Sequence, residues 1–98
     1  MVSILKATEI EIQQALAELD SWTVVDGKLH REYKFRSFVQ AFGFMAQVAL
    51  LAERADHHPE WFNVYNRVVV DLTTHEAGGI TQKDLDLAHK MEEVASRM

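Results

Sequence analysis

The 98-residue chain contains no cysteine and only one proline, Pro59. Without cysteine it can form no disulfide, and the cysteine-based zinc sites of small domains are excluded. A domain of this size buries only about 60–65% of the surface that its unfolded chain exposes. We therefore interpret residues 1–98 as one domain that gains support from partner subunits. The lack of cysteine also suits a reducing compartment, and we expect a cytoplasmic protein.

Positive charge is scarce, and long apolar runs are missing. Lys plus Arg is 10 and Asp plus Glu is 15, which gives a formal net charge of −5. The only local basic cluster is Lys28, Arg31, Lys34 and Arg36, and Glu32 interrupts it. Direct nucleic-acid binding is therefore not expected. No apolar run approaches the roughly 20 residues that span a bilayer, and the N-terminal segment lacks a signal-peptide core, so we expect no membrane association.

Capping and turn signals predict the elements of the first half of the chain. The pairs Thr8–Glu11 and Ser37–Gln40 have the spacing of capping boxes, which begin helices. Asp26-Gly27 favours a tight hairpin turn, because both residues tolerate positive φ. In the strand after this turn, apolar and polar residues alternate, so one sheet face should be covered and the other wet. Helices are expected at 8–20 and 38–55, and strands at 22–25 and 28–35.

The second half repeats the hairpin and ends in a third helix. Strands at 61–65 and 67–73 flank a turn near Tyr65-Asn66, and Gly78-Gly79 then breaks the chain. Thr81–Asp84 is another capping box, before a final apolar-striped helix. The order is α-β-β-α-β-β-α. Adjacent hairpins pair antiparallel, so we predict an α+β fold, with a four-stranded antiparallel sheet covered on one face by helices.

The helix at 38–55 is apolar around nearly its whole circumference. A helix of this kind is usually buried, and one small core can hardly cover all of it. We therefore expect a homo-oligomer, with Val39, Phe44 and Leu51 partly buried between subunits.

Histidines stand where helices and strands are predicted to end. In His57-His58-Pro59 the proline should end the preceding helix near His58, since the residue before proline avoids helical geometry. His75 follows the fourth predicted strand. Imidazole titrates near neutral pH and suits general acid–base catalysis. Taken alone, such histidines are more often solvated residues at the ends of elements than catalytic groups.

Several neighbouring side chains could assist the histidines or could be purely structural. Thr73 and Thr74 could donate hydrogen bonds to a polar ligand or to the loop backbone. Asp84 fills the last position of a capping box, and Glu53 could be a charge on the helix surface. Trp61 could belong to the core or an interface, although its indole would stack well on a flat heteroaromatic ligand.

A metal site is not expected. Adjacent histidines rarely point at one ion, and the useful His-x-x-x-His spacing is missing. We also find no Gly-rich phosphate loop and no nucleophile elbow in the sequence.

The ordered set of polar residues in the second half resembles the signature of the pterin-4a-carbinolamine dehydratases. The pattern is Glu-x-x-x-His-His-Pro-x-x-x-Asn-x-Tyr-Asn, then Leu-x-Thr-His, then Gly-Gly-x-Thr-x-x-Asp. Its defining positions are Glu53, His57, His58, Pro59, Asn63, Tyr65, Asn66, Leu72, Thr74, His75, Thr81 and Asp84.

The resemblance implies a fold, an assembly and a site. Members of this family have a four-stranded antiparallel sheet with helices on one face, and they form dimers and tetramers. Their motif histidines line the pterin site and match His57, His58 and His75. By the same resemblance, Glu53 and Asp84 orient the imidazoles, and the pocket is walled by Trp61.

The activity implied is dehydration of 4a-hydroxytetrahydrobiopterin to quinonoid dihydropterin and water. It would recycle the pterin used by an aromatic amino-acid hydroxylase and would need no metal or organic cofactor. His57 and His75 are expected to be the acid and base, with His58 auxiliary. The alternative is a non-catalytic dimerisation cofactor of a homeodomain transcription factor, which would bind through the helix at 38–55.

Overall fold

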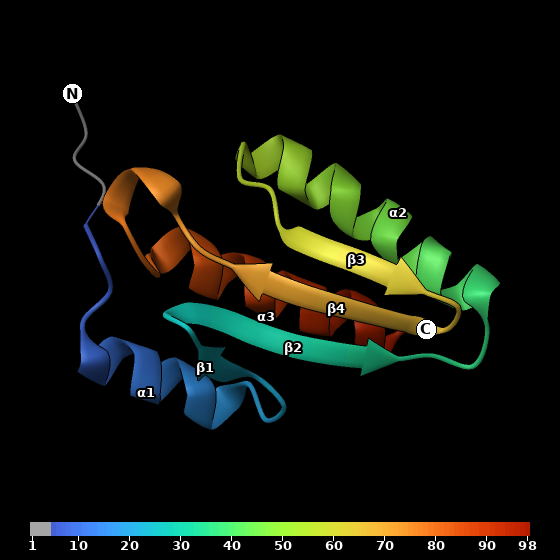
Figure 1. Ribbon diagram of the computed structural model, residues 1–98, viewed down its shortest axis with the longest axis horizontal. Coiled ribbons are helices and arrows are strands. Elements are labelled where there is room, and N and C mark those ends of the chain that lie inside the picture. Colours follow the sequence, from blue (N-terminus) through green and yellow to red (C-terminus); the bar gives the residue numbers. More distant parts are fainter. Residues whose placement is uncertain (1–4) are drawn as a thin grey trace.

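A computed structural model of the protein describes residues 5–98 (Figure 1). Its element order confirms the predicted α-β-β-α-β-β-α arrangement and adds a short 3₁₀ helix, η1, after the last strand. Within the described residues no helix is long and apolar enough to cross a membrane. The elements are α1 (Glu9–Glu18), β1 (Thr23–Val25), β2 (Lys28–Lys34), α2 (Phe38–Ala55), β3 (Glu60–Val64), β4 (Arg67–Leu72), η1 (His75–Ala77) and α3 (Gln82–Ser96).

The four strands form one antiparallel sheet in the order β1-β2-β4-β3. Each hairpin closes through a two-residue turn. In the first turn φ is 52° at Asp26 and 78° at Gly27, which confirms the predicted positive φ at both residues. The two hairpins join at the centre, where Leu29 of β2 pairs with Leu72 of β4. Side chains on one face of these strands form a common core with all three helices, and Figure 1 shows α3 running behind the sheet.

Two of the three predicted capping boxes are complete, at the starts of α1 and α3. At α2 the box is only half formed. The Ser37 hydroxyl accepts the Gln40 N–H at 3.0 Å, as predicted. The Gln40 side chain does not return to Ser37, because its Oε1 accepts the N–H of Arg36 at 2.9 Å.

Helix α2 packs on the core through Ala41, Phe44, Val48 and Ala52. The prediction that Phe44 lies between subunits is therefore wrong, since its side chain is 0% exposed within its own chain. Leu51 is half-buried against the same core. A helical wheel with two apolar sides does not show which side turns inward.

The end of α2 differs from the position that Pro59 alone indicated. The helix ends at Ala55, because Asp56 adopts the left-handed conformation with φ 51° and ψ 43°. The next N–H, that of His57, donates to the Ala52 carbonyl at 3.0 Å and closes the final turn. His57 and His58 therefore extend from the loop between α2 and β3.

Replacing the buried Phe44 by alanine should lower the free energy of unfolding by about 3–5 kcal/mol, the usual cost of emptying a core phenylalanine site. The matched control is Phe62→Ala on the open sheet face, where the side chain is half-exposed, and its loss should be clearly smaller. Urea unfolding of both variants at one protein concentration measures the difference. Equal losses would contradict the packing described for α2.

Candidate active site

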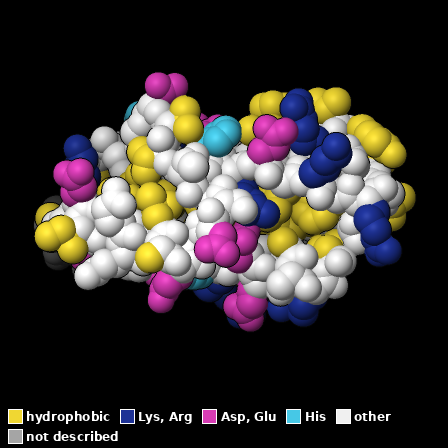
Figure 2. All heavy atoms as spheres, turned by 90° about the horizontal axis from the view of Figure 1, so that it is seen from below, with side chains coloured by type: hydrophobic (Ala, Val, Ile, Leu, Met, Phe, Trp, Pro, Cys, Tyr) yellow, Lys and Arg dark blue, Asp and Glu magenta, His cyan; other side chains and the backbone are white. Residues whose placement is uncertain are grey.

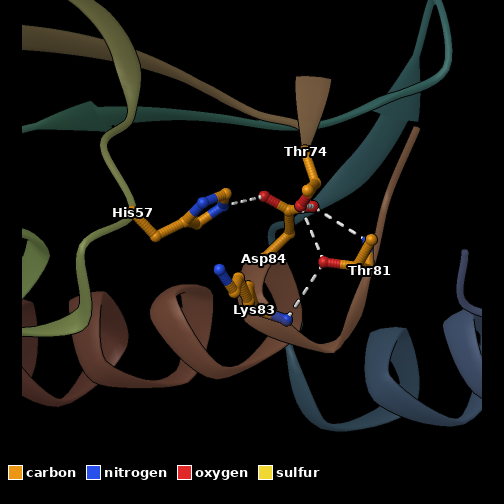
Figure 3. Close-up of polar contacts among 5 residues, drawn as sticks. All are labelled: His57, Thr74, Thr81, Lys83 and Asp84. Atoms are coloured by element: carbon orange, nitrogen blue, oxygen red, sulfur yellow. Dashed lines mark hydrogen bonds and ion pairs between the residues drawn. The ribbon is translucent and has the colours of Figure 1, made fainter. Parts of the chain in front are cut away.

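The carboxylate of Asp84 is completely buried at the start of α3. Its Oδ2 accepts the Thr81 backbone N–H at 2.9 Å and the Thr74 hydroxyl at 2.8 Å (Figure 3). The Thr74 and Thr81 hydroxyl oxygens are also 2.7 Å apart. A buried carboxylate needs several donors to offset its lost hydration, and the capping box supplies one of them.

His57 supplies the donor for the other oxygen of Asp84. The distance from its Nε2 to Asp84 Oδ1 is 2.5 Å, and the imidazole is largely buried. Figure 3 shows His57 reaching the carboxylate from the loop after α2, with Thr74 and Thr81 on the other side. An ionised carboxylate only accepts hydrogen bonds, so Nε2 of His57 carries the proton in this contact. Nδ1 is then the ring nitrogen available to a ligand.

The neighbouring His58 has a different environment. Its Nε2 lies 2.9 Å from Glu53 Oε1, and the two side chains are 60% and 81% exposed. Water screens such a pair, so it orients the ring only weakly. The adjacent histidines thus contact two carboxylates of very different burial. The buried Asp84 fixes the His57 ring, whereas Glu53 contacts His58 on the solvent-exposed surface of α2.

All three motif histidines line one hollow of about 350 Å³. His75 reaches it from the start of η1, and the two other histidines reach it from the α2–β3 loop. The volume falls within the range of small-molecule sites. The lining residues are Asp56, His57, His58, Glu60, Thr73, His75, Glu76 and Lys83.

The remaining residues predicted for the site occupy different positions. Thr73 lines the hollow, whereas Thr74 and Asp84 lie behind it as the buried support of His57. Glu53 contacts the site only through His58. Trp61 is not in the lining, because its side chain packs half-buried against the hydrophobic core.

Four residues that sequence reasoning missed also line the hollow, namely Asp56, Glu60, Glu76 and Lys83. Asp56, Glu76 and Lys83 each adjoin a predicted site residue, and this adjacency is the only signal that the sequence offers for them. Glu60 is engaged by the Lys28 ammonium at 2.6 Å, and this hydrogen bond raises the pKa of Lys28. Among residues 5–98, no group of three or more His, Cys, Asp or Glu side chains is arranged to hold a metal ion.

Comparison with known proteins shows to which family the chain belongs. The family model described as pterin 4 alpha carbinolamine dehydratase matches residues 5–94. The chain belongs to this dehydratase family. The resemblance noted in the sequence is therefore confirmed over nearly the whole chain.

Individual members of the dehydratase family are similar along almost their full length. A protein of Solibacter usitatus named "Putative pterin-4-alpha-carbinolamine dehydratase" is 64% identical over 91 residues, which cover 93% of this chain and 96% of that protein. A Brucella ovis protein of the same name is 53% identical over 92 residues, covering 92% and 95%. The crystal structure of a "transcriptional coactivator/pterin dehydratase" from Brucella melitensis matches with a TM-score of 0.87 and 53% identity, over 92% of this chain and 98% of that one.

The two histidine–carboxylate pairs should differ in their contribution to stability. Asp84→Asn replaces a buried acceptor by an amide that cannot satisfy all the same donors, and should lower the free energy of unfolding by about 1–3 kcal/mol. Glu53→Gln is the matched change at the exposed pair and should cost less than about 1 kcal/mol. Urea unfolding provides both values. An Asp84→Asn chain as stable as the wild type would show that the buried network does not support the fold.

Proposed function

We propose that this protein removes water from a 4a-hydroxytetrahydropterin and releases a quinonoid dihydropterin. The observation that carries the proposal is the arrangement of three imidazoles around one hollow, one of them anchored on a buried carboxylate. Membership of the dehydratase family supports the choice of substrate. A reaction of this kind would follow an aromatic amino-acid hydroxylase, whose pterin product it would return to use, and we expect it in the cytoplasm.

The reaction requires two proton transfers on a flat ring. The C4a–O bond breaks, and the departing hydroxide takes up a proton to leave as water. A base removes the proton of the neighbouring ring nitrogen, whose electron pair then forms the C=N double bond to C4a. Two imidazoles placed around the ring can perform both transfers at neutral pH. We assign these transfers to His57 and His75.

The buried support gives His57 a defined role. Because its Nε2–H donates to Asp84, the ring offers Nδ1 to the substrate and holds a fixed orientation. Thr74 and Asp84 act through this ring, and Glu53 acts in the same way on the auxiliary His58. Thr73 lines the hollow, and we assign it to hydrogen bonding with the pterin. We assign Trp61 to packing beneath β3.

The direct test is the decay of 4a-hydroxytetrahydrobiopterin, generated in situ, with and without protein. His57→Ala and His75→Ala should each slow the catalysed decay by about 10²–10⁴-fold, the usual contribution of one acid–base group. The matched control is His30→Ala, since His30 pairs with Asp71 on the open sheet face and does not line the hollow. Wild-type rates in both site variants would refute the assignment, and an unchanged decay with the wild-type protein would refute the function.

A second function is favoured by one observation. The Brucella melitensis relative is named a transcriptional coactivator as well as a pterin dehydratase. A coactivator needs a surface for a protein partner, and α2 offers an exposed apolar one. If the protein lacks dehydratase activity but binds a transcription factor through α2, this second function is the correct one.

We propose that the exposed side of α2 is also the contact between subunits. A single stripe opposite the core carries apolar side chains, and Val39 is 79% exposed. Such a stripe is costly to leave in water, and a stable interface removes about 1,200–2,000 Å² of surface. The stripe consists of Phe38, Val39, Phe42, Ala46, Ala49 and Leu50.

Leu50→Glu should lower the oligomeric state, because it places a charge within the proposed contact. The side chain is exposed within its own chain, so the variant should fold. Val25→Glu introduces the same charge at another exposed apolar position, on β1, and should leave the assembly unchanged. Light scattering measures the mass of each. A wild-type monomer of 11.2 kDa at micromolar concentration would contradict the proposal.

A further inference from the structure

A second and larger hollow lies away from the histidines, where the end of β2, the start of α2 and the end of α3 meet. Its volume is about 520 Å³, within the range of small-molecule sites. In Figure 2 an apolar hollow occupies the right-hand half of the face, with Lys and Arg side chains around it. The lining residues are Arg31, Tyr33, Lys34, Phe35, Arg36, Gln40, Ala95 and Met98.

The charge of this hollow is opposite to that of the whole protein. The chain carries a formal net charge of −5, yet the lining contains three cations and no acidic side chain. Among the described residues, Lys34 and Arg36 form no ion pair. The fold therefore brings Arg31, Lys34 and Arg36, three of the four residues of the basic cluster, to the lining of one hollow. Lys28, the fourth member, pairs with Glu60 instead.

Arg31 is held in place at the inner wall. Its guanidinium carbon lies 4.2 Å from the centre of the Tyr33 ring, a cation–π contact. Its Nε is 3.8 Å from a Glu92 oxygen that already accepts hydrogen bonds from Tyr33 and from Trp22. Within residues 5–98 this buried Nε has no hydrogen-bond partner. The Arg31 Nε therefore lacks a hydrogen-bond acceptor, although Glu92 lies within ion-pair distance of it.

The rest of the lining is apolar or donates hydrogen bonds. The Tyr33 and Phe35 rings are stacked, with centres 5.8 Å apart and planes 11° apart, and Ala95 and Met98 from the end of α3 complete the apolar part. Gln40 uses its oxygen to accept the Arg36 N–H, so its NH₂ group remains as a donor. Cations and amide donors beside an aromatic wall match a ligand that has an anionic head and a flat apolar body.

We propose that this hollow binds a small organic monocarboxylate that carries an aromatic group. The carboxylate contacts the Arg31 and Arg36 guanidiniums, which suit its planar shape, and Lys34 adds charge at the rim. The aromatic group lies against Phe35 and Met98. This site shares no lining residue with the histidine hollow, so it stands independently of the proposed dehydratase activity.

Three probes titrated into the full ¹⁵N-labelled chain separate the contributions of charge and ring. 4-Phenylbutyrate should give saturable amide shifts at the end of β2, the start of α2 and the end of α3. The neutral 4-phenylbutan-1-ol and the ring-free butyrate should bind roughly tenfold or more weakly, since each lacks one half of the recognition. The double variant Lys34→Gln/Arg36→Gln should weaken 4-phenylbutyrate by a similar factor. Arg54→Gln, at an exposed arginine in the last turn of α2 and outside the lining, is the matched control and should bind like the wild type.

Three outcomes would overturn the proposal. The first is equal binding of the alcohol and the acid, which would show that charge is not recognised. The second is unchanged binding by a double variant whose dispersed spectrum shows that it is folded. The third is shifts confined to residues around His57 and His75, which would place the acid in the other hollow.

Discussion

The buried carboxylate of Asp84 is the group on which the histidine hollow depends. A carboxylate without water must find its donors in the protein, and these come from three separate segments. The Thr81 N–H belongs to the start of α3, the Thr74 hydroxyl follows β4, and the His57 imidazole lies in the loop after α2. Satisfying one anion therefore holds three chain segments together, and one of them carries an imidazole with a defined free nitrogen. The hollow owes its geometry to this requirement for donors.

The order of the elements could be predicted because the signals are local. A capping box, a two-residue turn and a strand with alternating polarity each depend on neighbouring residues only. The packing of α2 could not be predicted in this way. Phe44 and Phe42 occupy equally apolar sides of the helix, and only the packing of α2 on the sheet and on α3 makes Phe44 a core residue. The end of α2 at Ala55 agrees with the predicted range 38–55, whereas the end near His58 that Pro59 alone indicated is too late, because left-handed geometry at Asp56 has no strong signal in a non-glycine residue.

The candidate site shows the same division between local and long-range information. The spacing of His57, His75 and Asp84 indicated that they belong together, through their resemblance to a family motif. Their roles depend on burial, which the spacing does not reveal: Asp84 supports His57 from inside, whereas Glu53 contacts His58 in water. The lining residues Glu76 and Lys83 were missed, because a charged residue near a turn looks the same whether it faces a hollow or the solvent.

The pairing of β2 with β4 has a consequence for how the chain folds. Each hairpin closes through a two-residue turn and is a local event, whereas Leu29 meets Leu72 only after the whole of α2 has been looped between them. Loop closure of this length costs entropy before any contact repays it, so the central pairing is expected to limit the folding rate. His57 and Thr74, in contrast, lie at the two ends of the second hairpin, which the pairing of Glu60 with Asp71 closes locally. The two segments that carry the histidines are therefore expected to meet early, and the hollow is expected to be completed when α3 packs and brings Asp84 to His57.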